Sequence, residues 1–413
     1  MIVIVGTLDT KGDKIAYLKQ LIEKKGNKTL VVDCGVLDEP LFKADISREE
    51  VAKAAGKSIT EIRSLGSEAE AIKVMTQGAS KVVAELYSSG KLEGLLGAGG
   101  TMATSIFMPV ADLLPVGVPK VFFATTAFSN ILRPGVVPPD LIVIPAVSNI
   151  WGISSLTKRT LENAAGAILG ATQMYREGER LEGKNFVAIT TLGTSELKYI
   201  VWLKPRLEKM KNEVLAFHIG GGQGWIFEHL IRQGMIKGVL DMCFMDLCPD
   251  NMIKAGFLST VGRLEAAGER GIPQVIAPGS INAFIWQKPI DTLPVSFDAS
   301  TRRLHIHNEL SCGFEKSLEE IAQTAEIMAT KINKSRGPRA IVIPKLGFSE
   351  FDKPGYTFHN PERSKVFTQA LMAKISPEVT VVELDLHIND QTFAEEVAKI
   401  YSSMVKRYEE GML

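Results

Sequence analysis

The residues with the clearest capacity for chemistry follow the first hydrophobic run of the chain, Ile2–Val5. They form the stretch GTLDTKG, whose candidate ligand-binding members are Gly6, Thr7, Asp9, Thr10, Lys11 and Gly12. An amphipathic pattern follows, which predicts a helix from about Asp13. Amides and hydroxyls at the start of a helix bind phosphate, because the helix dipole favours an anion there. Lys11 would neutralise the phosphate and Asp9 would hold a metal ion. The alternative is a polar turn in which Asp9 only caps the helix.

A second glycine-rich stretch, GAGGTMATS, begins at position 97 and precedes an apolar helical pattern. Its glycines allow backbone amides to close around an anion, and its threonines add hydroxyls. The stretch is neither a Walker A motif nor a dinucleotide fingerprint, since Met102 stands where the last glycine of the fingerprint would fall. The members that we expect to contact a nucleotide are Gly97, Gly99, Gly100, Thr101 and Thr104.

Two further polar residues follow hydrophobic runs in the same half of the chain. Asp33 ends the second run, where its carboxylate would meet a ribose hydroxyl, and Thr125 follows the fourth. In an open parallel sheet, ligands bind outside the carboxyl ends of the strands. We therefore expect these residues and the two glycine-containing stretches to form one nucleotide pocket.

The second half of the chain has more groups that exchange protons near neutral pH. Our catalytic candidates are one carboxylate, Asp246, and three histidines. His305 and His307 lie in RRLHIHN, and His387 lies in DLHIND. If RRLHIHN is extended, its two histidines share one face. Imidazoles and carboxylates suit general acid–base chemistry. The same groups could instead bind a metal, or fix strand ends through structural hydrogen bonds.

Hydrophobic runs separated by helical patterns must position all of these residues. The runs are continuous rather than alternating: Ile2–Val5, Leu30–Val32, Leu92–Leu96, Val121–Phe123 and Leu141–Ile144. Such runs are typical of parallel strands covered on both faces. Between the second and third runs, residues 47–89 have a helical pattern throughout. The predicted fold class is α/β, with two Rossmann-like, doubly wound domains and mainly parallel sheets.

The two halves of the chain repeat the same order of elements. A hydrophobic strand, a Gly/Thr-rich turn, a helix and a second strand open the chain, and the series begins again at Lys184. The charged stretch YREGERLEGK, residues 175–184, separates the two series. We predict an N-terminal nucleotide-binding domain, residues 1–180, and a C-terminal domain for a second ligand, residues 184–413.

The composition argues against several classes of function. The 47 Lys and Arg residues equal the 47 Asp and Glu residues, so the chain lacks a basic field for nucleic acid. No apolar run is long enough to span a membrane. Four scattered cysteines without a signal peptide predict a cytoplasmic location. A small molecule is the expected ligand.

A series of short stretches makes the whole chain resemble a known family. In order, they are GTLDTKG, GAGGTMAT, GVPKVFFAT, NAAGAI, GVLD, RLEAAGERGIPQVIAPG, HIHN and HIND. The series is similar to the ATP-binding domain of the tobamovirus-replication inhibitor of tomato and its bacterial and archaeal relatives. The resemblance implies a homodimer of chains with two Rossmann-like subdomains, and a nucleotide on Gly6 to Gly12, Asp33, Gly97 to Thr104 and Thr125. It transfers no catalytic residue.

We therefore expect a cytoplasmic protein that binds ATP with Mg²⁺. We further expect an enzyme of small-molecule metabolism that acts in a cleft between the two domains. One alternative is a nucleotide-sensing module that acts on a protein partner without catalysis. Another is a metal-dependent hydrolase or lyase centred on the C-terminal histidines.

Overall fold

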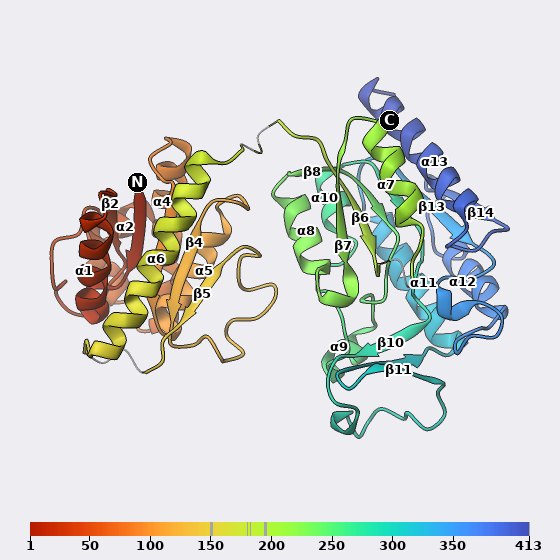
Figure 1. The fold of residues 1–413 in the computed structure, drawn as a ribbon, viewed down its shortest axis with the longest axis horizontal. Helices are drawn as coiled ribbons and strands as arrows, with labels where there is room; N and C mark the ends of the chain where they lie inside the picture. The colour runs from red at the N-terminus through yellow and green to blue at the C-terminus, as the bar shows by residue number, and fades with distance from the viewer. Residues whose placement is uncertain (149–151, 180, 182, 194–195, 413) are drawn as a thin grey trace. The chain divides into compact units, whose positions relative to one another are not determined.

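The computed structural model describes residues 1–148, 152–179, 181, 183–193 and 196–412. The chain divides into two compact units, Met1–Leu181 and Glu182–Leu413, which we call the N-terminal unit and the C-terminal unit. Each unit is built around its own parallel sheet, with helices on both faces (Figure 1). The predicted fold class is confirmed: the chain is α/β, with two Rossmann-like, doubly wound sheets.

Five strands form the sheet of the N-terminal unit: β1 Ile2–Gly6, β2 Thr29–Asp33, β3 Gly94–Gly99, β4 Lys120–Ala124 and β5 Ile142–Pro145. All neighbours are parallel, in the order β2-β1-β3-β4-β5. From β1 the chain turns to one side to form β2, and from β3 it turns to the other side to form β4. The winding direction therefore reverses between β1 and β3, which is where open α/β sheets bind ligands.

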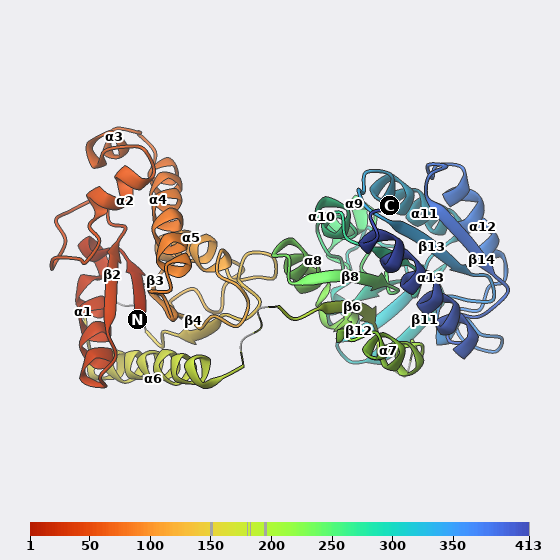
Figure 2. The ribbon, with the colours of Figure 1, turned by 90° about the horizontal axis from the view of Figure 1, so that it is seen from above.

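Helices cover both faces of this sheet. They are α1 Leu8–Lys24, α2 Arg48–Ala54, α3 Ile59–Arg63, α4 Glu68–Ser88, α5 Thr101–Asp112 and α6 Ser155–Glu177. Helices α1 and α6 cover one face, where Ile15 and Leu161 belong to one apolar core. Helices α2, α4 and α5 cover the other face, where Met75 and Phe107 belong to a second core (Figure 2). Because both faces are buried, the strands need apolar residues at successive positions.

The segment 47–89, which we predicted to be helical throughout, contains three helices with two breaks. Gly56 and Gly66 adopt left-handed φ angles of 82° and 69°, which end α2 and α3. Ser58 and Ser67 then accept hydrogen bonds from backbone amides at the starts of α3 and α4. These breaks turn α3 back over the carboxyl edge of the sheet.

The C-terminal unit has a six-stranded parallel sheet. Its strands are β6 Phe186–Thr191, β7 Glu213–His218, β8 Ile236–Asp241, β9 Gln274–Ile276, β13 Arg339–Pro344 and β14 Thr380–Leu384. They follow the order β14-β13-β9-β8-β6-β7. Read from β7, the first five positions repeat the strand order of the N-terminal unit, and β14 adds one strand at the far edge. The repeated series in the sequence thus corresponds to a repeated topology.

The described residues of this unit contain seven α-helices: α7 Ile200–Lys209, α8 Gly224–Arg232, α9 Asp250–Ala255, α10 Ala266–Arg270, α11 Leu318–Asn333, α12 Glu362–Met372 and α13 Gln391–Glu409. Short 3-10 helices occur at Ile219–Gly221, Ile290–Thr292 and Glu350–Asp352. Met328 of α11 and Phe367 of α12 share a core with Ile341 of β13. Tyr401 of α13 packs against β8 at Gly238. A Cβ added to Gly238 would lie 2.0 Å from the tyrosine hydroxyl. The glycine therefore permits this close packing.

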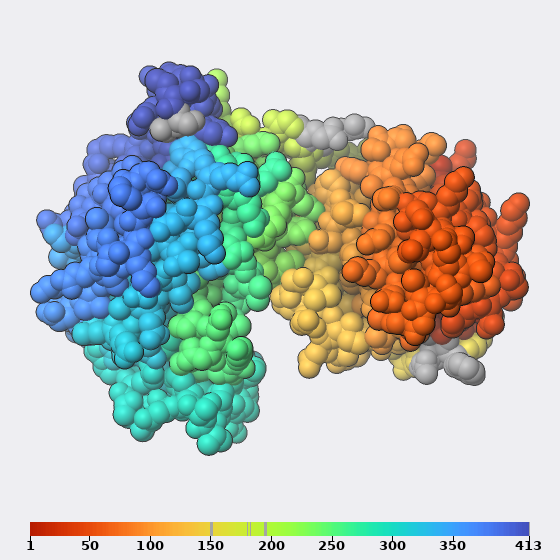
Figure 3. Space-filling view, turned by 180° about the vertical axis from the view of Figure 1, so that it is seen from behind, coloured from red at the N-terminus to blue at the C-terminus, as the bar shows by residue number. Residues whose placement is uncertain are grey.

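A small antiparallel sheet, which the sequence did not predict, stands out from the rest of the C-terminal unit (Figure 3). Its strands are β10 Ala283–Trp286, β12 Ser311–Glu315 and β11 Leu304–Asn308, paired in that order. It has its own aromatic core, in which Phe257 packs against Phe284, Trp286 and Phe297. This core explains how a short sheet remains ordered outside the main one.

Candidate functional site

A pocket of about 410 Å³ lies at the carboxyl edge of the N-terminal sheet. Small-molecule sites usually have volumes of about 300–1,000 Å³, so this pocket suits a ligand of nucleoside size. It is formed by the residues that follow β1 and β2 together with α3, α4 and the start of α5. The lining residues are Thr7, Asp9, Thr10, Cys34, Val36, Leu37, Ile62, Arg63, Gly66, Ser67, Glu68, Ala71, Ile72, Met75, Met102 and Ile106.

Most of the pocket wall is apolar. Val36 and Leu37 come from the loop after β2, and Ile72 and Met75 lie one turn apart on α4. Met102 lies in the first turn of α5 and completes this side. An apolar slot of this kind can hold a flat ring and leaves orientation to the few polar groups that surround it.

Polar groups gather where α1 begins. Thr7 and Thr10 join their hydroxyls in a hydrogen bond of 2.8 Å. Asp9 accepts a hydrogen bond of 2.9 Å at Oδ2 from the Leu37 amide, whereas its buried Oδ1 has no partner among the described residues. A buried carboxylate oxygen without a partner is costly, so it marks a position where a ligand, a cation or water would bind. Arg63 donates from Nε and Nη2 to the carbonyls of Val36 and Leu37, at 2.7 and 3.1 Å.

Of the residues that we predicted to bind a nucleotide, Thr7, Asp9 and Thr10 line the pocket. The predicted loop is much shorter than expected, because α1 begins at Leu8 rather than near Asp13 and only Thr7 separates it from β1. The amides of Thr10 and Lys11 therefore already donate to the Thr7 carbonyl.

The other residues of this first stretch have packing roles. Gly6 allows β1 to approach α1, since a Cβ would lie 2.0 Å from Ile15 Cδ1. Gly12 faces Leu41, because a Cβ added to Gly12 would lie 2.6 Å from the Cβ of Leu41. Lys11 is partly buried on α1 and does not line the pocket. Gly6, Lys11 and Gly12 do not line this pocket, and contact of these three residues with a ligand stays a prediction.

The glycines of the second stretch bring α5 close to β3. A Cβ on Gly97 would lie 2.3 Å from the Phe107 ring, and a Cβ on Gly99 would lie 2.3 Å from Ala103 Cβ. Gly100 is the N-cap residue of α5 and, unlike the other two, is partly exposed. Gly97 and Gly99 are thus required for packing, while Gly100 remains at the carboxyl edge.

The three threonines near α5 differ in accessibility. Thr104 is 1% exposed, and its hydroxyl donates to the Gly100 carbonyl at 2.9 Å and lies 3.1 Å from that of Thr126. Its hydroxyl is thus used within the fold, and this arrangement does not support a role for Thr104 as a ligand contact. Thr101 and Thr125 are exposed. The backbone amide of Thr125 donates to the Gly99 carbonyl at 3.1 Å. Of these three threonines, only Thr101 and Thr125 have exposed side chains.

Asp33 does not present its carboxylate to a ribose. It is 1% exposed, and its Oδ1 accepts hydrogen bonds from the amides of Leu8 and Gly35 at 3.0 and 2.9 Å. Burial raises the pKa of this carboxyl group, while the two amides partly oppose the rise. Its role is to hold the loop after β2 against the start of α1.

In the C-terminal unit, Asp246 belongs to a buried ion-pair network. Arg263 is 1% exposed and donates from Nε to both carboxylate oxygens of Asp246 at 3.1 Å. The same guanidinium contacts Asp241 at 2.5 Å and Glu228 at 3.4 Å. Burial raises the pKa of Glu228 and of Asp246, although the charge of Arg263 opposes the rise in both. Asp246 is 1% exposed and paired, so we correct its assignment as a catalytic residue.

The histidine candidates belong to different local contacts among the described residues. Both ring nitrogens of His387 are engaged, Nε2 with the Ser349 carbonyl at 3.0 Å and Nδ1 with the Asn389 amide at 3.1 Å. His305 and His307 lie on β11 with ring centroids 6.5 Å apart, and the His305 ring packs against Phe351. In the part of the chain that the structure describes, no three His, Cys, Asp or Glu residues are arranged to hold a metal. The metal-dependent alternative loses its geometric basis.

Sequence reasoning missed a polar cluster at the carboxyl edge of the C-terminal sheet. It contains Glu196 after β6, Ser280 and Asn282 after β9, Ser349 after β13, and Asn389 after β14. The strand end APGSIN was visible in the sequence, but it matches no common catalytic motif. The contacts become apparent only when the four loops are brought together.

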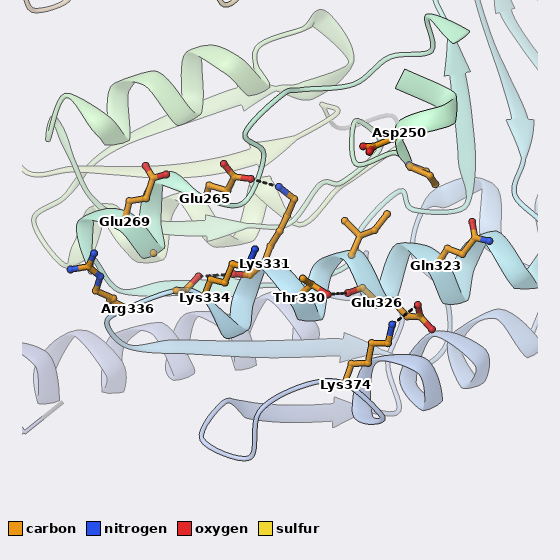
Figure 4. A pocket seen from close by; sticks show the side chains of 14 residues that line it. Asp250, Glu265, Glu269, Gln323, Glu326, Thr330, Lys331, Lys334, Arg336 and Lys374 are labelled. Atoms are coloured by element: carbon orange, nitrogen blue, oxygen red, sulfur yellow. Dashed lines mark hydrogen bonds and ion pairs between the residues drawn. The ribbon is translucent and has the colours of Figure 1, made fainter. Parts of the chain in front are cut away.

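A larger hollow, of about 940 Å³, is a groove along the outer face of α11 (Figure 4). Two ion pairs lie among its charged side chains: Lys331 binds Glu265, and Lys374 binds Glu326 at 2.7 Å. The charged residues that line this open groove are balanced in sign, so they offer no net charge to attract a ligand. We therefore favour the N-terminal pocket as the candidate site.

Within the described residues, none of the helices has both the length and the apolar character needed to cross a membrane.

Comparison with known proteins gives relatives along the whole chain. A UPF0261 protein of Clostridium tetani is 35% identical over 411 residues, 98% of this chain and 99% of that protein. A UPF0261 protein of Brucella suis is 32% identical over 409 residues, 98% of this chain and 95% of that protein. The ToMV resistance protein Tm-1(GCR237) of Solanum lycopersicum is 28% identical over 411 residues, 94% of this chain but 54% of that longer protein.

Among solved structures, one match is UDP-GlcNAc 2-epimerase from Neisseria meningitidis bound to UDP-GlcNAc, at 11% identity. The alignment covers 67% of this chain and 82% of the epimerase chain, with a TM-score of 0.23. This likeness is too low to support any argument about the site. Two family models match, the Uncharacterised protein family (UPF0261) N-terminal domain over residues 1–177 and the corresponding C-terminal domain over residues 184–405. The chain therefore belongs to the uncharacterised protein family UPF0261.

Proposed function

We propose that the N-terminal unit binds ATP with Mg²⁺ in the pocket at the carboxyl edge of its sheet. One observation carries the proposal: an apolar slot of nucleoside size adjoins the N-terminus of α1 and lies beside that of α5, at the reversal of winding. Helix N-termini favour phosphates, and apolar slots favour bases, so both ends of a nucleotide find suitable surroundings.

The available residues fit the parts of the ligand. The slot between Leu37, Ile72 and Met75 would hold the adenine, and the hydroxyls of Thr7 and Thr10 would face the phosphates. Asp9 supplies one carboxylate oxygen without a partner among the described residues. One or two carboxylates together with phosphates suffice for Mg²⁺, which retains several waters in nucleotide sites. Asp9 would help to hold the cation, which would supply positive charge against the mutual repulsion of the phosphates.

Titration calorimetry of ATP with Mg²⁺ into the full chain tests the proposal. Ile72→Trp should fill the slot and abolish the binding heat, whereas Lys11→Ala lies outside the pocket and should change the affinity less than twofold. Asp9→Asn should retain binding of ATP in the presence of EDTA and lose the gain in affinity that Mg²⁺ provides. Equal affinities for the wild type and Ile72→Trp would place the nucleotide elsewhere or refute its binding.

A further inference from the structure

Ser280 occupies an unusual position at the end of β9. Its φ angle is +52°, in the left-handed region that few residues other than glycine adopt. The preceding Gly279 packs against Met242, which directly follows β8. A Cβ added to Gly279 would lie 2.2 Å from the Met242 carbonyl oxygen. The Ser280 amide donates to the Phe348 carbonyl at 2.8 Å, which holds the turn in place. A sharp, strained turn that places a serine at the carboxyl edge of a sheet is also how hydrolases present a nucleophile.

The hydroxyl of Ser280 contacts a carboxyl group. Its Oγ donates to Oε1 of Glu196 at 3.0 Å. Ser280 is 3% exposed and Glu196 is partly exposed, so the pair lies just below the surface. A nucleophile within hydrogen-bond distance of a base is the geometric requirement for activating a serine.

Neighbouring loops fix the position of Glu196. Its carbonyl accepts hydrogen bonds from Asn389 Nδ2 at 2.9 Å and from the Glu350 amide at 3.1 Å. The Asn389 side chain also accepts from the Lys198 amide at 2.7 Å. Glu196 and Lys198 are therefore held against the loops after β13 and β14. His387 supports the same arrangement through Ser349 and Asn389.

We propose that Ser280 is a nucleophile and Glu196 its general base, and that the C-terminal unit cleaves an ester or thioester of a small acid. This inference does not depend on nucleotide binding by the N-terminal unit. It gives DLHIND a positioning role through Asn389 and His387, rather than the catalytic role that we had expected for His387.

The proposed step can be followed atom by atom. The Ser280 Oγ forms a bond to the carbonyl carbon of the ester while its proton passes to Glu196 Oε1. The bond from that carbon to the leaving group then breaks, and Glu196 returns the proton to the departing oxygen or sulfur. Water next attacks the acyl group on Ser280 and gives a proton to Glu196. The bond from the acyl carbon to Ser280 Oγ then breaks, and Glu196 returns its proton to Oγ. The acid is released and the serine is restored, so the net reaction is hydrolysis.

Burial raises the pKa of Glu196 to about 7, and the hydrogen bond from Ser280 opposes the rise. Such a carboxylate is a stronger base than an ordinary one. Two other titratable groups, Tyr199 and Cys243, interact with Glu196. Burial raises the pKa of each well above its usual range, so both stay neutral at pH 7. Lys198 and Lys353 are paired with Glu350 at 3.2 and 2.9 Å, beside the Glu196 backbone.

An ethyl fluorophosphonate probe tests the proposal on the full chain, because it forms an Oγ–P bond with an activated serine and releases fluoride. We expect one adduct in the intact mass, located on Ser280 by peptide mass spectrometry, and no adduct in Ser280→Ala. Ser311→Ala, a serine on β12 outside this cluster, should label at the wild-type rate. Glu196→Gln should slow labelling by about 100-fold, the usual contribution of a general base.

The pH dependence supplies a second readout. Labelling of the wild type should accelerate as the pH rises through about 7, because Glu196 accepts the serine proton only when ionised. Circular dichroism establishes that each variant is folded before labelling. A folded wild type that gains no adduct on Ser280 would overturn the proposal, and so would equal labelling rates for Glu196→Gln and the wild type.

Discussion

The carboxylate of Asp33 lies 3.0 Å from the amide of Leu8, and this hydrogen bond joins the end of β2 to the start of α1. The same oxygen holds the amide of Gly35 at 2.9 Å. Two loops at the edge of the candidate pocket thus depend on one buried acceptor.

Replacing this acceptor should separate the role of the oxygen from that of its charge. Asp33→Ala leaves two amides without a partner and should lower the free energy of unfolding by about 2–4 kcal/mol. Asp33→Asn retains an oxygen acceptor and should cost less than about 1 kcal/mol. Urea denaturation followed by circular dichroism measures both values. Similar losses in the two variants would mean that the charge, rather than the acceptor, is required.

The two Asp33 variants should also differ in pH dependence. Burial raises the pKa of Asp33 in the folded state, so folding favours the protonated form. The stability from this group is present at low pH and is lost as the pH rises through the folded-state pKa. Asn does not titrate and has no such loss. The difference in the free energy of unfolding between the wild type and Asp33→Asn should therefore favour the variant more at pH 8 than at pH 4.

Gly97→Ala should disturb the packing of α5 on β3. The added methyl group would lie 2.3 Å from the Phe107 ring, so the ring or the helix must shift, at a cost of about 1–3 kcal/mol. Gly166→Ala is a matched control, because Gly166 is exposed within α6 and has open space around it. Alanine favours helix there, so the control should gain about 0.5–1 kcal/mol. Thermal and urea denaturation should show these opposite signs.

Arg263→Met should strongly destabilise the C-terminal unit. The substitution leaves the buried carboxylates of Asp241, Asp246 and Glu228 without their cation, and removal of one partner from a buried pair costs about 3–5 kcal/mol. Surface substitution Arg159→Met, which removes an exposed pair with Glu162, should cost less than about 1 kcal/mol. Urea denaturation of both variants provides the comparison.

The pH dependence of Arg263→Met follows from the same carboxylates. The pKa values of Glu228 and Asp246 are already raised in the folded state, and loss of the opposing charge should raise them further. A raised carboxyl pKa makes stability fall as the pH increases through it. The variant should therefore recover part of its lost stability at pH 5 relative to pH 8. A constant deficit between these pH values would contradict the assigned role of the carboxylates.

The fold could be predicted largely from the sequence, because two-sided burial of a parallel strand requires an unbroken apolar run. The strands Ile2–Gly6 and Lys120–Ala124 are examples, and both coincide with predicted runs within two residues. The small antiparallel sheet was missed because β11 is largely exposed and has no such run. Its stability comes from contacts with aromatic residues distant in sequence.

The candidate site was predicted only in part. Thr7, Asp9 and Thr10 were found because a strand end followed by a helix is visible locally. Polar residue type did not reveal that Asp33 and Thr104 point inward, because burial depends on tertiary packing. Ile72 and Met75 were missed because an apolar residue on a helix usually belongs to the core, and only the path of α3 and α4 makes these two a pocket wall.

The position of α13 has a consequence for synthesis of the protein. Glu395 of α13 pairs with Arg206 of α7, and Tyr401 packs onto β8 in the middle of the sheet. A ribosome must therefore add almost two hundred further residues after α7 before that helix meets its partner. The N-terminal unit has no such requirement, since α6, the last helix that covers its sheet, ends at Glu177. During translation we expect the first unit to become resistant to proteases while the second remains exposed to chaperones.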